Sequence, residues 1–155
     1  MNSDLYERRK WFKEYFESTN AMVRRSRPKE FWFTCPVCGY PTHLEHGGFD
    51  ICQLCNWEDD GQDDPEADEV KGGPNGDFSL REARENFAAY RTMYRPGSAG
   101  FERCKAGTSG NLEAGILVVI LEAIRQANYT DHALVSKLWK VAAEFGPRGY
   151  ANLPD

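Results

Sequence analysis

Apolar residues recur at helical spacing near the N-terminus of the chain. They follow a capping pair, Asp4 with Glu7, in which each residue can satisfy a free backbone N–H at the start of a helix. A period close to 3.6 residues places apolar side chains on one helix face. The sequence therefore predicts an N-terminal helix with one buried face, formed by Leu5, Phe12, Tyr15, Phe16 and Met22.

A second helical pattern follows the turn-rich segment 72–76. Ser79 and Glu82 form a capping box, and the motif Arg95-Pro96-Gly97 ends the pattern. We expect this helix to run to about Tyr94 and to bury Leu80, Ala83, Phe87, Tyr90 and Tyr94. The Gly- and Ser-rich stretch 96–110 is typical of a linker.

The C-terminal part contains two further apolar helical patterns. The first covers 112–126, and the second begins at Thr130 as a capping residue and ends at Gly146. The short link at Asn128-Tyr129 predicts an antiparallel helical hairpin over residues 111–146. The apolar stretch 116–124 could pack within the hairpin or form a dimer, so the oligomeric state stays open.

Two C-x-x-C pairs lie between the first two helical patterns. Cys35 and Cys38 form the first pair, and Cys52 and Cys55 form the second. Two residues between cysteines let one tight turn direct both sulfurs at one ion, and two such turns supply a tetrahedral four-thiolate site. Because zinc with four thiolates has no position open for water, we expect one structural zinc ion per chain and no catalytic residue at this site.

The residues around the pairs agree with paired metal-binding turns. Gly39 and Asn56 follow the two pairs and tolerate the positive φ that such a turn needs. The segment between the pairs is long enough for a short hairpin with Gly47-Gly48 at its tip. His43 and His46 could replace a thiolate, but with four cysteines present we expect them to be surface or packing residues.

Other uses of the cysteines fit the sequence less well. The sequence does not open with an apolar run and a cleavage site, so it gives no sign of secretion and we expect a cytoplasmic protein. In the reducing cytoplasm, paired C-x-x-C motifs bind metal more often than they form disulfides. A thioredoxin-like site needs one C-x-x-C motif in a βαβ setting. The remaining cysteine, Cys104, is interpreted as a small buried hydrophobe.

Length and hydropathy limit the fold. The 155 residues suit a single domain, and no stretch approaches the ~20 apolar residues of a membrane span. We predict an α+β fold in which a small four-cysteine zinc ribbon with a β-hairpin packs with three to four α-helices. Aromatic residues gather around the ribbon and are expected to join it to these helices.

Charge is distributed unevenly along the chain, whose net charge is −5. Residues 50–70 contain nine acids and no Lys or Arg, whereas the stretch before Cys35 is basic and densest at 24–29. The acidic run is either a solvated loop or a negative surface for a basic partner. As a partner surface, its candidate contact residues are Glu58, Asp59, Asp60, Asp63 and Asp64.

An ordered series of motifs resembles a known family. The motifs are CPVCGY at 35–40, DICQLCNWEDDGQD at 50–63, GGPN at 72–75 and SLREARENF at 79–87. Over about residues 33–95 the chain resembles the bacterial cysteine-rich CPCC domain, which implies a small zinc-ribbon-like protein without an established activity. Val37 stands where the family has its middle cysteine. The four expected ligands remain, but a redox role for three adjacent thiols would be lost.

These observations favour one function over two alternatives. We expect a zinc-stabilised acidic protein-binding module, most specifically an immunity- or antitoxin-type inhibitor of a toxin or nuclease partner, and not an enzyme. A metal-dependent hydrolase would need ligands of the acidic run to converge on a second ion, and the three histidines lack an H-E-x-x-H motif. A nucleic-acid-binding zinc ribbon is disfavoured because the acidic balance opposes phosphate binding.

Overall fold

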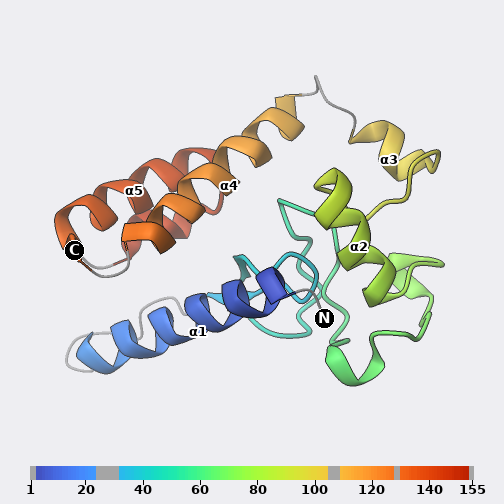
Figure 1. Cartoon of the computed structure of the whole chain (residues 1–155), viewed down its shortest axis with the longest axis horizontal. Coiled ribbons are helices and arrows are strands. Elements are labelled where there is room, and N and C mark those ends of the chain that lie inside the picture. Colours follow the sequence, from blue (N-terminus) through green and yellow to red (C-terminus); the bar gives the residue numbers. More distant parts are fainter. Residues whose placement is uncertain (1–2, 24–31, 105–108, 128–129, 154–155) are drawn as a thin grey trace.

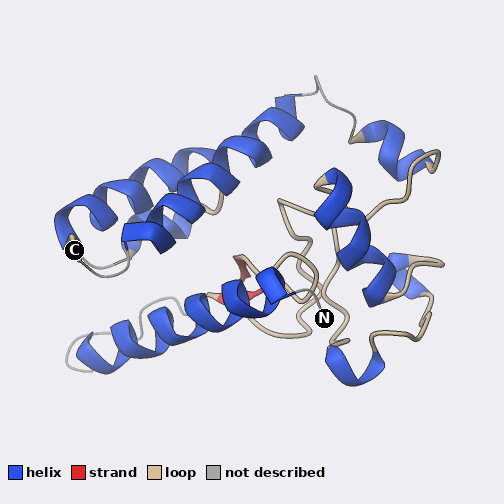
Figure 2. Ribbon diagram, viewed as in Figure 1, coloured by secondary structure: helices blue, strands red, loops and turns tan. Residues whose placement is uncertain are grey.

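A computed structural model of the chain describes residues 3–23, 32–104, 109–127 and 130–153. Within these ranges, α-helices accompany a two-stranded antiparallel sheet (Figures 1 and 2), which confirms the predicted α+β ribbon packed with helices. The basic residues 24–29 and the link 128–129 lie outside the described residues. The elements are α1 Ser3–Val23, β1 Phe33–Thr34, β2 Pro41–His43, η1 Asp64–Glu66, η2 Gly73–Asn75, α2 Leu80–Tyr90, α3 Ala99–Arg103, α4 Ser109–Ala127, α5 His132–Phe145 and η3 Arg148–Asn152.

Helix α1 buries the aromatic face that the sequence predicts. Leu5, Phe12, Tyr15 and Phe16 are all buried, and the ring of Phe12 lies near that of Tyr40. The indole Nε1 of Trp139 on α5 donates a hydrogen bond of 2.9 Å to the hydroxyl of Tyr15. The N-terminal helix is therefore joined both to the ribbon and to the C-terminal helices.

The strand pair forms at a different place from the predicted hairpin. Strands β1 and β2 pair across the first cysteine turn, with Phe33 opposite His43, and not across Gly47-Gly48. Instead, Gly47 donates its N–H to the Asp59 carboxylate at 2.8 Å. A Cβ at Gly47 would lie 3.3 Å from the Cα of Gly61, so the two backbones approach closely here. The glycines thus serve a loop-to-loop contact.

Helix α2 begins as predicted and ends four residues early. The Ser79 side chain accepts the N–H of Glu82 at 3.1 Å. Arg91 then adopts a left-handed conformation with φ 61° and ends the helix. After this reversal, the N–H of Met93 donates to the carbonyl of Cys55 at 2.8 Å. The tertiary bond to the second cysteine turn explains why the apolar pattern continues to Tyr94 beyond the helix.

The predicted linker contains a short helix, α3. Ser98 is its N-cap, and its hydroxyl accepts the N–H of Phe101 at 3.2 Å. The ring of Phe101 meets that of Tyr90 edge to face, which holds α3 against the end of α2. Side-chain capping and this ring contact therefore order part of a segment for which the glycine and serine content predicted a linker.

Helices α4 and α5 lie side by side (Figure 1). The cap of α5 is Asp131 and not Thr130, because the Asp131 side chain accepts the N–H of Leu134 at 3.0 Å. The Thr130 hydroxyl donates to the carbonyl of Ala127 at the end of α4. No helix in the described part of the chain has the length and apolar character needed to cross a membrane.

Aromatic side chains join the ribbon to the C-terminal helices. Tyr40 and Tyr150 are both buried, and the Tyr40 hydroxyl donates to Glu122 on α4 at 2.7 Å. The Tyr150 hydroxyl, on η3, donates to the carbonyl of Pro41 on β2 at 2.5 Å. Rings with one polar tip can fill a core and still satisfy a buried acceptor, which suits a ribbon too small to enclose a core alone.

Candidate metal centre

The first cysteine turn is held by two backbone hydrogen bonds. The N–H of Cys35 donates to the carbonyl of Tyr40 at 2.8 Å, and the N–H of Gly39 donates to the carbonyl of Cys35 at 2.9 Å. Gly39 has φ 76°, as the sequence predicts for the end of such a turn. A Cβ at Gly39 would lie 2.8 Å from the Leu5 side chain, so a larger residue here would have to displace Leu5 on α1.

The second turn repeats the first. The N–H of Cys52 donates to the carbonyl of Trp57 at 2.8 Å, and the N–H of Asn56 donates to the carbonyl of Cys52 at 2.9 Å. Asn56 has φ 71°, which asparagine tolerates better than most residues. An isolated bridge between Ile51 and Glu58 flanks this turn, in the position that β1 and β2 occupy around the first.

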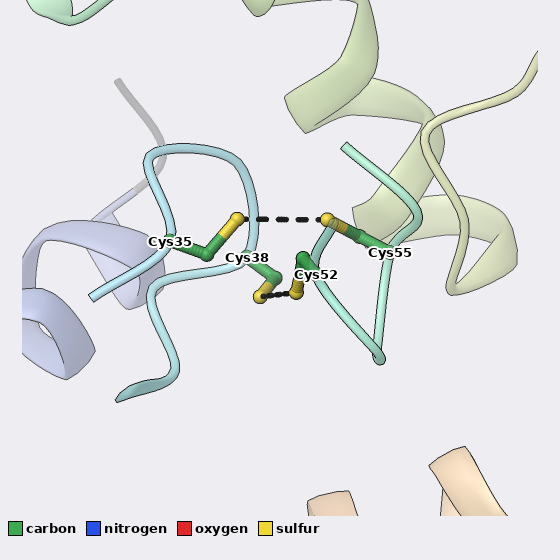
Figure 3. A group of neighbouring side chains, drawn as sticks. All are labelled: Cys35, Cys38, Cys52 and Cys55. Carbon is green, nitrogen blue, oxygen red and sulfur yellow. Dashed lines mark hydrogen bonds between the residues drawn. The ribbon is translucent and has the colours of Figure 1, made fainter. Parts of the chain in front are cut away.

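The two turns bring four sulfurs together (Figure 3). The sulfurs of Cys35 and Cys55 lie 3.6 Å apart, and so do those of Cys38 and Cys52. All four sulfurs lie within 4.8 Å of one another. All four residues are fully buried. Among the described residues they form the one group of His, Cys, Asp or Glu side chains with the spacing of a metal site. The predicted ligand residues thus meet at one point and could hold a metal ion.

The protonation of the cluster follows from its burial. Burial raises the pKa of the Cys35 and Cys55 thiols well above the usual value. Burial also disfavours the Cys52 thiolate, but hydrogen bonds from the three neighbouring thiols hold its pKa below the usual range. Four close sulfurs can therefore not all ionise without a compensating cation. A metal ion supplies that charge and makes the four-thiolate state favourable.

Neighbouring donors are directed at the sulfurs. The Thr42 hydroxyl donates to the Cys52 sulfur at 3.1 Å, and the N–H of Trp57 donates to that of Cys55 at 3.5 Å. His43, next to Thr42, is fully buried, and neither ring nitrogen has a hydrogen-bond partner among the described residues. Burial disfavours its charged form, but the nearby Cys35 sulfur raises the pKa of His43 to about 9. Such donors suit a thiolate-rich metal centre.

The comparisons with known proteins agree with this geometry. Residues 33–103 match the family model described as Cysteine-rich CPCC. This segment is a cysteine-rich CPCC domain. The match extends past the resemblance at 33–95 and takes in α3. Neither the curated proteins nor the solved structures contain a match to the chain. In this CPCC domain, Val37 lies buried inside the first turn, where a third cysteine is not needed for four ligands.

The acidic run folds into an ordered loop beside the CPCC turns. Asp59 is 1% exposed, and its carboxylate accepts the N–H groups of Gly47 and Gly61. Asp60 accepts the N–H of Gln62 and the Gln62 side-chain amide. Glu58 is half-buried, and its backbone N–H and carbonyl both bond to the Asn75 side chain. This part of the run is held by hydrogen bonds within the loop and by hydrogen bonds to Gly47 and Asn75, which lie outside it.

The remaining candidate contact residues lie at the rim of the same loop. Asp63 caps η1 in a capping box with Glu66, and both of its carboxylate oxygens accept from the Nη2 of Arg9 on α1 at 3.0 Å. Asp64 accepts a hydrogen bond of 2.7 Å from Arg84. Partial burial raises the pKa of Asp64, but the Arg84 hydrogen bond outweighs it and the net shift is downward. The role of the five acids in binding a partner stays a prediction.

Several residues that build the site were not identified from the sequence. Asn75 belongs to the motif GGPN. Its side chain hydrogen-bonds to the backbone N–H and carbonyl of Glu58, and this contact joins segments that are distant in the chain. Arg84 donates its Nε to the carbonyl of Pro36 in the first turn, which a helix-face pattern does not reveal. For Thr42, closeness to the cysteine pairs was the available signal. His43 was expected to be a surface or packing residue, and it is fully buried.

Proposed function

We propose that this chain is a zinc-stabilised protein-binding module, most specifically an immunity- or antitoxin-type inhibitor of a toxin or nuclease. The observation that supports the proposal is an acidic loop built directly onto the metal centre. The isolated bridge between Ile51 and Glu58 joins the start of the loop to the second cysteine turn. The order of the loop is thereby coupled to metal binding.

The loop is organised before any partner binds. Asp59, Asp60 and Asn75 fix its backbone through the hydrogen bonds described above, and the Asp63 capping box closes its next turn. A rigid surface loses less conformational entropy on association than a mobile one. Pre-organised charge also discriminates between partners and speeds their encounter.

Accessible carboxylates lie on the outer side of this loop. The side chains of Asp64, Asp68 and Glu69 are 48%, 73% and 64% exposed. The Arg84 side chain, which pairs with Asp64, is only 10% exposed, whereas the pairs of Asp68 with Arg81 and of Glu69 with Lys71 lie at the surface and are screened by solvent. Lysine or arginine side chains of a basic partner could therefore take over these carboxylates at small cost. In this proposal Asp59 shapes the loop, and the outer acids make the contact.

Zinc is the metal that the donor set favours. Four thiolates in a closed site suit a soft, tetrahedral ion and leave no coordination position for a substrate. Elemental analysis of protein prepared without added metal should find one zinc ion per chain. Thiol alkylation should modify Cys104 alone until a chelator is added. Folded protein without metal, or with four reactive thiols, would contradict this part of the proposal.

Inhibition is tested with the metal-loaded chain as bait in a lysate of its source. The captured protein should be basic, and its nuclease or toxic activity should fall to a minimum at one equivalent of the chain. The double variant D68N/E69Q should weaken capture about tenfold. E113Q/E144Q removes the same charge from exposed positions on α4 and α5 and serves as the control. Equal capture by both variants, or a captured partner whose activity is unchanged, would count against the proposal.

A further inference from the structure

A cavity of about 800 Å³ lies beside the second cysteine turn. Its walls come from the end of α2, from α3 and from one face of α4, and its base comes from the turn itself. The apolar part of the lining consists of Leu54, Phe87, Tyr90, Phe101, Ala114, Val118 and Val119. The CPCC segment and the C-terminal helices thus form this cavity together.

The charge of the cavity is opposite to that of the protein as a whole. Among the described residues, no Asp or Glu side chain belongs to its lining, although the chain has 24 acids and a net charge of −5. Two arginines, Arg91 and Arg103, line it and have no carboxylate partner among the described residues. Arg91 instead lies over the Phe87 ring, with its guanidinium carbon 5.5 Å from the ring centre. By contrast, Arg81, Arg84 and Arg95 each pair with an acid.

An exposed apolar stripe on α4 continues the cavity wall. Leu112 is 65% exposed and Val119 is 69% exposed, and Gly115 lies between them at helical spacing. Positions separated by three, four and seven residues share one helix face. Because Leu112 is not part of the cavity lining, the apolar surface extends beyond the cavity. A small molecule held in the cavity would leave part of this stripe exposed.

Gly115 has no explanation within the described chain. Glycine in a helix interior destabilises the fold by roughly 0.5–1 kcal/mol relative to alanine. A Cβ at this position would have no heavy atom within 4 Å, so packing in this chain does not require a glycine. Gly100 and Gly146 differ, because a Cβ at either would overlap a neighbouring side chain. The missing side chain at Gly115 therefore leaves room beside the cavity for a group from outside the chain.

We propose that the cavity and the α4 stripe bind an acidic peptide segment of a partner protein. Apolar side chains of the peptide pack on Val119 and Leu112, its backbone approaches α4 at Gly115, and its carboxylates bond to Arg91 and Arg103. The amide side chain of Gln53 lines the same cavity and suits a polar peptide backbone. This surface is separate from the acidic loop, and the inference does not depend on the inhibitor function.

Selection from random twelve-residue peptides displayed on phage tests the proposal, with the metal-loaded full chain as target. Selected peptides should combine Asp or Glu with Leu, Ile or Phe. Fluorescence polarisation should show about a tenfold loss of affinity for R91Q/R103Q, because charge-assisted hydrogen bonds are lost. Arg148, which is exposed on η3 and distant from the cavity in sequence, provides the control R148Q, for which affinity should be unchanged.

A second variant separates binding from folding. Gly115→Leu fills the open space on α4 and replaces glycine with a strong helix former, so the melting temperature should stay the same or rise. The same substitution should reduce peptide affinity about tenfold by blocking the backbone approach. D68N/E69Q on the acidic loop should leave peptide affinity unchanged. The proposal is overturned if selection yields basic peptides or none, or if R91Q/R103Q and G115L bind the selected peptides as tightly as the unmodified chain.

Discussion

The two cysteine turns have the same internal hydrogen bonds but different neighbours. The first turn is contacted by α1, where the Nε of Arg8 donates to the carbonyl of Cys38 at 2.7 Å, by α2 through Arg84, and by η3 through Tyr150. The second is contacted by the end of α2 through Met93, and by α3 through the Asn56 amide, which lies 3.3 Å from the Cys104 sulfur.

This difference follows the boundary of the CPCC match. The contacts of the second turn lie within residues 33–103, whereas α1 and η3 lie outside them. The second turn is thus supported by the family segment itself, and the first is where the additional helices of this chain attach. A metal ion between the turns would couple the two parts of the fold. The predictions below test this division.

Removing the metal should have the largest effect, and it should affect both turns equally. Structural zinc contributes ~10–16 kcal/mol of binding free energy, comparable to the ~5–15 kcal/mol net stability of a whole domain. We expect chelation, Cys35→Ser and Cys52→Ser each to abolish the cooperative thermal transition of the ribbon, as measured by near-ultraviolet circular dichroism. Restoring zinc should recover the transition of the chelated chain. An unchanged melting curve in chelator would disprove a structural metal.

Substitution at the end of each turn should have unequal effects. Gly39→Ala places a Cβ at φ 76° and 2.8 Å from Leu5, so we expect a loss of ~2–4 kcal/mol in the free energy of unfolding. Asn56→Gly removes one weak bond to sulfur and relieves a positive φ, so its net effect should be within ~1 kcal/mol. Denaturant unfolding of the zinc-loaded variants measures both. Equal losses would show that the α1 contact does not constrain the first turn.

The same comparison shows what could be predicted from the sequence. The cysteine spacing, Gly39 and Asn56 identified both turns, because those features are local and their geometry depends on a few residues. The positions of the strands and of the end of α2 were wrong. Gly47-Gly48 has the composition of a hairpin tip, but it packs against Gly61, and Tyr94 continues an apolar pattern after Arg91 has ended the helix.

Those errors have one physical cause. The deciding hydrogen bonds join segments that are distant in the chain, such as Met93 with Cys55 and Gly47 with Asp59. The acidic residues illustrate the same limit. Sequence alone made Asp59 and Asp64 equivalent members of one charged run, whereas burial and partners separate a loop-shaping carboxylate from an accessible one.

Buried side chains that tie each turn to its neighbours should have intermediate effects. Tyr150→Phe removes the donor to Pro41 beside the first turn, and Asn86→Ala removes the donor of 2.8 Å to the carbonyl of Met93 beside the second. Each removes a buried hydrogen bond to a backbone carbonyl, so we expect ~1–3 kcal/mol of destabilisation in either case.

The location of the effect should differ between these two variants. Hydrogen exchange should become faster in β2 for Tyr150→Phe and in residues 92–94 for Asn86→Ala. Tyr150→Leu, which also removes the ring, should exceed Tyr150→Phe in its effect on η3. Faster exchange at the same amides in both variants would mean that the turns are not supported separately.

The smallest expected effect is the acid dependence of one ion pair behind the second turn. The Arg95 hydrogen bonds, at 2.5 and 2.8 Å, hold the pKa of Glu82 below its ordinary value of 4.5. The unfolded chain therefore binds the proton more readily, so this stabilisation is complete above about pH 4.5 and is lost as the pH falls through the lower folded value. Because both side chains are partly exposed, solvent screening limits the contribution to ~0.2–1 kcal/mol.

Glu82→Gln tests this ion pair. The free energy of unfolding of the variant should lack this part of the pH dependence, so its difference from the unmodified chain should shrink as the pH falls. Comparing the two proteins at each pH, with zinc content measured in parallel, separates this effect from the metal release that acid causes by protonating the thiolates.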